Sequence, residues 1–287
     1  MPRRQPLLHA LLAATAAILV GGQLLDGQAE PGPVTAATVA YVRGEAATLD
    51  IAGAVRARGA ARGEAESALE VLAPAVATTS HPRALADAFR SYFAYRTAHP
   101  ERVRKPYLYF VDYGLPNTTP RGYVFDMEAL TLVEGPFMVA HGRGSAAELG
   151  VPRRFSNAVG SAATSLGLYV AQELYDFRGT AGGQAYRSTG LRLAGVSGDF
   201  NSRARVRGVV AHGAPYVTAQ GAGRSEGCPA VEQERAERLL PKLAHGGLVF
   251  LFAPDAGWLG RDPWVRAASA DTARPDEGWV AEPGGRA

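Results

Sequence analysis

One cysteine, two lysines and no apolar run of membrane-spanning length are the most informative scarcities of this sequence. A chain with one cysteine cannot form an internal disulfide, so Cys228 is either a buried, inert thiol or a reactive one. Lysine supplies only two of the 30 basic residues, and the net charge is only +3. Because no cluster of basic residues alternates with aromatic ones, the sequence gives no reason to expect nucleic acid as a partner.

The N-terminus has the features of an export signal. Arg3 and Arg4 precede an apolar run over residues 10–20, and residues 27–29 supply small side chains where a signal peptidase requires them. The run is shorter than the roughly 20 residues of a membrane span. The sequence therefore predicts a cleaved signal peptide over residues 1–29, with an uncleaved anchor as the alternative. It also predicts an exported protein of the periplasm or cell envelope. No cysteine lies near residue 29, which excludes a lipoprotein anchor.

Composition divides the remaining chain into three parts. Residues 30–80 are rich in alanine and glycine and are interpreted as a linker with a short helix over residues 64–72. Residues 81–254 have the apolar periodicity of a folded domain. Residues 255–287 are predicted to be either a loosely ordered tail or a segment that packs its tryptophans onto the domain. These tryptophans are Trp258, Trp264 and Trp279.

The apolar residues of the domain first follow a helical period and then a period of two. Residues 81–99 repeat apolar and aromatic side chains at three- and four-residue spacings, which predicts a helix with its aromatic stripe in the core. Alternating patterns separated by glycine and proline then predict short strands. The expected strands cover residues 107–113, 122–127, 129–133, 136–141, 168–171, 191–193 and 248–253. The domain is therefore expected to be mainly β, with flanking helices.

Residues 208–231 hold the most specific chemical pattern. Residues 209–211 are typical of a buried strand, and His212 follows them, before Gly213 ends the strand. Cys228 comes sixteen positions later, after a glycine-rich loop and before Pro229, a favoured first residue of a helix. This order of residues is typical of a nucleophile and its base.

A helix that begins at Pro229 and continues through residues 231–240 would place Cys228 at its N-cap. The positive end of the helix dipole and a nearby imidazolium would both favour the thiolate. The backbone N–H groups of Gly227 and Cys228 are candidate donors to an oxyanion, and Ser225 is expected to shape the loop or orient the site.

The arrangement of His212, Ser225, Gly227 and Cys228 resembles the signature of the YkuD-type L,D-transpeptidases, cysteine enzymes of bacterial peptidoglycan. Glu226 stands where that signature usually has a second histidine, and Ala230 where it usually has Asn or Arg. A closer resemblance is to the murein L,D-transpeptidase catalytic domain proteins. It covers six blocks in order, at residues 139–145, 155–161, 164–167, 191–195, 209–217 and 223–231.

The resemblance implies a small β-sandwich with flanking helices and no cofactor. It also implies that the Cys228 thiolate attacks a peptidoglycan stem peptide, releases D-Ala and leaves a thioester. An amine acceptor then gives a cross-link, whereas water gives an L,D-carboxypeptidase. Carbapenem inhibition follows as an expectation, while the oligomeric state is left open.

Several further residues are candidate substrate contacts. Arg224 and Arg143 are available for a stem carboxylate, and His141 and Gly213 end strands that face the same region in this interpretation. The alternatives are a solvated Arg224 and, for His141, a hydrogen-bonded strand end. Two other functions stay open: a non-catalytic peptidoglycan-binding protein, motivated by Glu226, and a metal site. The histidine and cysteine spacings match no zinc pattern, so no metal is predicted.

Overall fold

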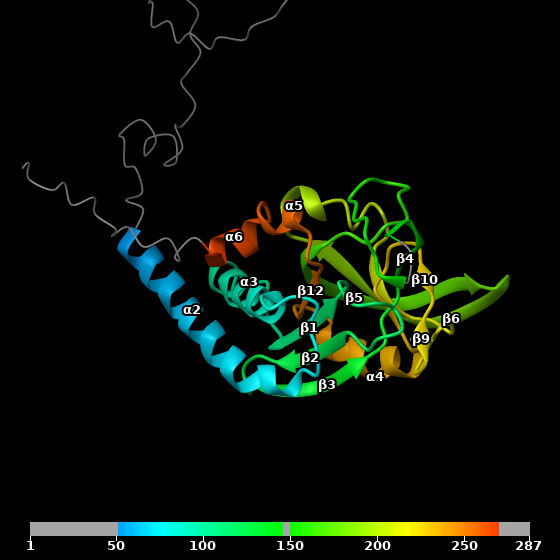
Figure 1. Cartoon of the computed structure of the whole chain (residues 1–287), viewed down its shortest axis with the longest axis horizontal. Helices are drawn as coiled ribbons and strands as arrows, with labels where there is room; N and C mark the ends of the chain where they lie inside the picture. The colour runs from blue at the N-terminus through cyan, green and yellow to red at the C-terminus, as the bar shows by residue number, and fades with distance from the viewer. Residues whose placement is uncertain (1–50, 146–149, 270–287) are drawn as a thin grey trace, which may run out of the picture. The chain divides into compact units, whose positions relative to one another are not determined.

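The protein is described by a computed structural model that covers residues 51–145 and 150–269 (Figure 1). The predicted signal peptide and the start of the predicted linker lie outside the described residues. Within these two ranges, no helix combines the length and apolar character needed to cross a membrane.

The domain is built on one eight-stranded sheet with the order β11-β7-β6-β5-β12-β1-β2-β3. Two pairs in it, β1 with β12 and β11 with β7, are parallel, and the others are antiparallel. The sheet strands are β1 (Tyr107–Asp112), β2 (Gly122–Asp126), β3 (Thr131–Phe137), β5 (Gly167–Ala181), β6 (Gln184–Gly195), β7 (Val210–Gly213), β11 (Ala230–Val231) and β12 (Leu248–Phe252). Two small ladders pair β4 (His141–Gly142) with β10 (Arg224–Ser225) and β8 (Val217–Thr218) with β9 (Gly221–Ala222). The expectation of a mainly β domain with flanking helices is confirmed.

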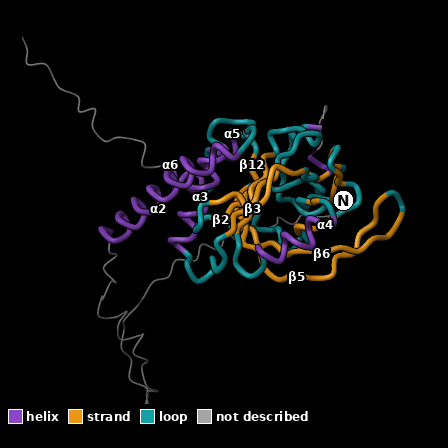
Figure 2. Tube along the Cα trace, turned by 90° about the horizontal axis from the view of Figure 1, so that it is seen from below, coloured by secondary structure: helices purple, strands orange, loops and turns teal. Residues whose placement is uncertain are grey.

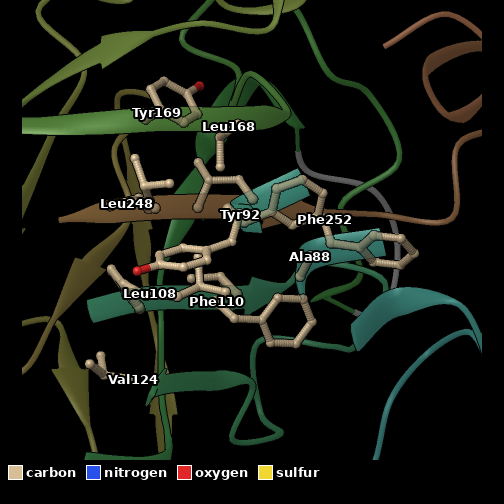
Figure 3. Close-up of a cluster of buried hydrophobic side chains, with 14 of the residues drawn as sticks. Ala88, Tyr92, Leu108, Phe110, Val124, Leu168, Tyr169, Leu248 and Phe252 are labelled. Atoms are coloured by element: carbon tan, nitrogen blue, oxygen red, sulfur yellow. The ribbon is translucent and has the colours of Figure 1, made fainter. Parts of the chain in front are cut away.

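The core lies where helix α3 (Ala84–Ala98) crosses the central strands. Every residue of β12 is buried, as its continuous apolar sequence predicts for a central strand. Figure 3 shows side chains of α3, β1 and β5 meeting in one cluster, among them Tyr92, Phe110 and Leu168. The predicted helix over residues 81–99 and its aromatic stripe are therefore confirmed, with the stripe in the core.

The longest departure from the expected strands is the β5–β6 hairpin. The sequence predicts only short strands at residues 168–171 and 191–193, whereas β5 and β6 continue to Ala181 and Gln184. Gly182 and Gly183 have φ angles of 55° and 80°, which suit a two-residue hairpin turn. Apart from Ser188, the outer half of the hairpin is exposed or half-buried, so its sequence lacks the apolar signal of a core strand. Figures 1 and 2 show the hairpin extending beyond the other strands.

The expected division into strands at residues 129–133 and 136–141 is wrong. One strand, β3, runs from Thr131 through Phe137, and β4 follows separately. Pro136 interrupts neither the strand nor the sheet because β3 is the last strand in the order, and an edge strand tolerates a proline.

Residues 51–72 form helix α2 (Ile51–Leu72) instead of the expected linker with a short helix. Ala61, Ala65, Ala68 and Leu72 are buried and recur at three- and four-residue spacings, which places them on one helix face. Helix α2 lies against α3 (Figure 1). The linker was expected because the segment is rich in alanine and glycine. Alanine, however, favours helices, and its small side chain lets α2 pack closely on α3.

Residues 256–269 also fold onto the domain, as helices α5 (Ala256–Leu259) and α6 (Pro263–Ser269). Trp258 is only 2% exposed, and its Nε1 donates to Asp262 at 2.8 Å. Trp264 packs edge-on against Tyr95 and donates from Nε1 to the Val196 carbonyl at 2.7 Å. Packing of the tryptophans, the second alternative above, therefore holds for these two. Trp279 lies outside the described residues.

We expect Ala68→Asp to destabilise the domain, because it places a carboxylate in the contact between α2 and the core. The expected loss is about 2–4 kcal/mol of unfolding free energy, measured by denaturant titration. Ala60→Asp, on the exposed side of the same helix, is the matched control and should have little effect. Equal stabilities of the two variants would contradict the packing of α2.

Candidate active site

Cys228 lies in a turn between β10 and β11 that is fixed at both ends. Ser225 of β10 pairs with Gly142, and the Ala140 N–H donates to the Ala230 carbonyl at 2.8 Å. The expected helix N-cap position of Cys228 is wrong. Helix α4 (Gln233–Leu243) begins after Glu232, because Ala230 and Val231 join the sheet as β11 instead. Glu232 occupies the N-cap of α4, so Cys228 does not cap the helix.

The strand that carries His212 is the parallel neighbour of the strand that follows Cys228. His212 of β7 is in register with Ala230 of β11. Two residues before Ala230, the Cys228 Sγ donates to the Gly208 carbonyl at 3.8 Å, and it accepts a hydrogen bond from the Val210 backbone. The thiol therefore lies beside the start of the strand that carries the imidazole.

One hydrogen bond determines the tautomer of His212. Its Nδ1 lies 3.0 Å from the Gly213 carbonyl oxygen, which can only accept, so Nδ1 carries the proton and Nε2 is left with its lone pair. His212 is 2% exposed, and burial lowers its pKa to about 4, against the smaller raising effect of the Gly213 carbonyl. Gly213, a predicted substrate contact, is itself buried and instead orients the imidazole.

The Cys228 thiol is neutral at the pH values at which the His212 imidazole is neutral. The residue is 9% exposed, and burial raises the pKa of Cys228 to about 11. The hydrogen bond from Val210 and the charge of Arg207 lower this pKa, and Glu226 raises it. Between about pH 4 and about pH 11 the site therefore holds a neutral thiol and a neutral imidazole.

Arg207 is a cation beside the cysteine turn that sequence reasoning missed. Its Nη2 would lie 3.4 Å from a Cβ built on Gly227, and its Nη1 donates to the Ser156 carbonyl at 2.8 Å and to Ser165 at 3.0 Å. No ion pair to Arg207 is found in the described part of the chain. The acceptors lie in the blocks at residues 155–161 and 164–167, but nothing in the sequence singles out one arginine among so many.

The backbone N–H groups of the turn differ in availability. Ser225 Oγ donates to the Cys228 carbonyl at 2.7 Å and accepts from the Gly227 N–H at 3.2 Å. Ser225 Oγ therefore bridges two residues of the turn, and it occupies the Gly227 N–H. No backbone acceptor for the Cys228 N–H is found among the described residues. Cys228 is therefore the better candidate for an oxyanion donor.

His141 is fully buried and hydrogen-bonded, and it is the first residue of β4 instead of the last residue of a strand. Its Nδ1 lies 2.9 Å from Nη2 of Arg121, so it accepts, and burial, with Arg121 and Arg224, lowers the pKa of His141 to about 3. Arg121 is also fully buried; it donates from Nε to the Val139 carbonyl at 3.0 Å and stacks on Tyr113. Arg121 was not predicted either, because no sequence pattern identifies an arginine that is buried against backbone carbonyl groups.

The other predicted substrate contacts are exposed. Arg143 forms an ion pair with Glu226 at 2.7 Å, and both side chains are more than half exposed. Arg224 pairs through its backbone with His141 and is exposed. Glu226 is therefore bound by an arginine, which weakens its effect on the thiol.

No group of three or more His, Cys, Asp or Glu side chains that could hold a metal occurs in residues 51–145 and 150–269.

Residues 77–252 match the family model described as the L,D-transpeptidase catalytic domain, which is more than half of the chain. No curated protein matches the chain.

Among solved structures, three L,D-transpeptidases are similar. The one from Mycobacterium smegmatis is 15% identical, with 52% of this chain and 59% of that chain covered and a TM-score of 0.32. The one from Stackebrandtia nassauensis is 14% identical, with 61% and 69% covered and a TM-score of 0.33. The one from Mycobacterium tuberculosis H37Rv is 14% identical, with 51% and 57% covered and a TM-score of 0.29. The chain thus spans 59% of the length of the first of them.

We expect Arg207→Met to raise the pKa of the Cys228 thiol, because it removes a positive charge that favours the thiolate. The rate of alkylation by iodoacetamide at a fixed, mildly alkaline pH should fall about tenfold for each unit by which that pKa rises. Arg207→Lys keeps the charge and should retain most of the rate. Arg203→Met is the control, because it removes an exposed arginine from the turn before β7 that also contains Arg207. Identical rates for both methionine variants would contradict the electrostatic role.

Proposed function

We propose that this chain, which belongs to the L,D-transpeptidase catalytic domain family over residues 77–252, is a cysteine L,D-transpeptidase that acts on peptidoglycan stem peptides. Family membership supports an enzyme of this kind. The observation that carries the proposal for this chain is the pairing of β7 with β11, which puts the His212 tautomer with a free Nε2 next to the strand that follows Cys228.

The first step is attack on the donor. Cys228 Sγ forms a bond to the carbonyl carbon of the L-to-D bond that precedes D-Ala, and His212 Nε2 takes the thiol proton. Because both groups are neutral at rest, the proton moves as the sulfur attacks, without a standing thiolate–imidazolium pair. This favours general-base catalysis over the alternative of a preformed ion pair.

Charge develops on the carbonyl oxygen as the tetrahedral intermediate forms. The Cys228 N–H is the candidate donor to this oxyanion, and one such donor contributes about 3 kcal/mol. Arg207 adds a positive charge next to the turn. The C–N bond then breaks, protonated His212 gives its proton to the departing amine of D-Ala, and a thioester joins the stem peptide to Cys228.

The second step resolves the thioester. An amine of a neighbouring stem attacks its carbonyl carbon while His212 accepts a proton, and the Cys228 sulfur leaves and recovers its proton. The product is a cross-link between the two stems. Water as the acceptor would instead release a free carboxylate, as in an L,D-carboxypeptidase. Since this substrate lies in the envelope, the proposal includes export, consistent with the pattern of residues 1–29.

A non-catalytic peptidoglycan-binding protein is the second candidate, and one observation favours it. Burial and Glu226 both raise the pKa of Cys228, which makes the resting thiol a poor nucleophile. The ion pair between Glu226 and Arg143 weakens the second effect, so we favour the enzyme.

Cys228→Ala should abolish covalent labelling by a carbapenem and release of D-Ala from a tetrapeptide donor, because it removes the nucleophile. Mass spectrometry of the purified protein detects the adduct, and chromatography of products with an added amine acceptor separates transpeptidation from hydrolysis. Wild-type protein that forms no adduct but binds peptidoglycan would support the non-catalytic candidate instead.

The pH dependence of acylation tests the neutral pair. The base works only when unprotonated, so the rate should stay high on the acid side until the pH falls through about 4, the pKa of His212. Deuterated water should slow acylation, because a proton moves during attack. A rate insensitive to deuterated water would instead indicate a preformed thiolate.

A further inference from the structure

The imidazole of His212 is stacked face to face on the ring of Phe177. The two ring centroids are 3.9 Å apart, and the ring planes differ by 14°. Phe177 belongs to β5, whereas His212 belongs to β7, and β6 lies between these strands in the sheet. The contact therefore crosses an entire strand.

A glycine on the intervening strand makes this contact possible. Gly190 of β6 is paired with His212 on one side and with Tyr175 on the other. A Cβ at Gly190 would lie 2.6 Å from Tyr175 Cε1 and 3.0 Å from Phe177 Cβ. Real contacts are longer than these, so any other residue at this position would displace the aromatic side chains of β5. Because Gly190 has no side chain, the ring of Phe177 can extend across β6 and contact the imidazole of His212.

Other aromatic side chains of the β5–β6 hairpin pack against Phe177. Tyr175 and Tyr186 have ring centroids 6.2 and 5.9 Å from that of Phe177, and Tyr186 continues to Tyr216 at 6.5 Å. Aromatic pairs at such separations stabilise one another by about 0.5–1.5 kcal/mol beyond their burial. The ring of Phe177 is therefore fixed by contacts with neighbouring aromatic rings, although Phe177 is only half-buried.

The hydrogen bond and the stack constrain the imidazole in different ways. The Gly213 carbonyl fixes Nδ1 at one edge of the ring, and Phe177 covers one face. Together they define the plane of the ring, and so the direction in which the Nε2 lone pair points. General-base catalysis depends on this direction, because a proton is transferred only in a near-linear geometry within hydrogen-bond reach.

We propose that Phe177 is a positioning residue for His212: through the space left by Gly190, the β5–β6 hairpin holds the plane of the catalytic imidazole and keeps water from one face. The inference rests on the proposed function, since it assigns Phe177 a role only if His212 is the base. It makes the hairpin part of the catalytic apparatus without any contact between Phe177 and the reacting atoms.

Phe177→Leu should slow acylation of Cys228 by a carbapenem by about 10- to 100-fold, with little change in the concentration at half-saturation. It should also move the acid limb of the pH profile upward from about pH 4. The sign follows from burial: exposing the imidazole to water stabilises its charged form, so the pKa rises toward its ordinary value and the base is lost at higher pH. A purely structural role for Phe177 would not move this limb.

Three further variants complete the experiment. Phe177→Tyr retains a ring and should restore both the rate and the limb. Gly190→Ala retains the phenylalanine but adds a methyl group that displaces its ring from the imidazole, so it should reproduce the effects of Phe177→Leu. It also serves if Phe177→Leu does not fold. Phe200→Leu makes the same change at a half-buried phenylalanine that stacks with Arg261, and it should behave as wild type.

Wild-type rates and an unmoved acid limb in folded Phe177→Leu or Gly190→Ala would overturn this inference, provided that Cys228→Ala is inactive. Full labelling of Cys228→Ala would instead overturn the proposed function. The two failures are therefore distinguishable.

Discussion

The parallel pairing of β11 with β7 is the constraint on which the site depends. It sets Ala230 beside His212 and draws the preceding cysteine toward the start of the same strand. The other partners of the turn, Ala140 and Gly142, hold it from the opposite side. Behind β7, the sheet continues through β6 and β5 to the buried central strands, so the candidate catalytic pair is anchored to the core by backbone hydrogen bonds.

Burial determines how this pair can work. It moves the pKa of His212 down and that of Cys228 up, so neither group is charged at rest. The nearby charge that favours an anion is that of Arg207, beside the turn. A buried site of this kind stabilises charge most where it develops during the reaction, which agrees with proton transfer during attack.

The parts of the fold that could be predicted are those in which one residue pattern has one structural meaning. The helix over 81–99 and the strands at 107–113 and 248–253 were predictable because their apolar residues follow a clear period or an unbroken run. The outer β5–β6 hairpin has no such pattern, since its residues are mostly exposed or half-buried and only Gly182-Gly183 indicates the turn. Helix α2 could not be predicted from apolar periodicity, because its buried face consists mainly of alanines, which do not stand out in an alanine-rich segment.

The residue pattern alone indicates the family and the candidate chemistry, through a lone Cys228, an upstream His212 and Ser225 just before the cysteine. The surroundings of these residues follow from the folded arrangement of the chain. It placed Cys228 before a strand rather than a helix, and it brought Arg207 and Phe177 to the pair from separate elements. The reason is that a residue type limits which reaction is possible, whereas pKa, tautomer and ring orientation come from neighbours that are distant in sequence.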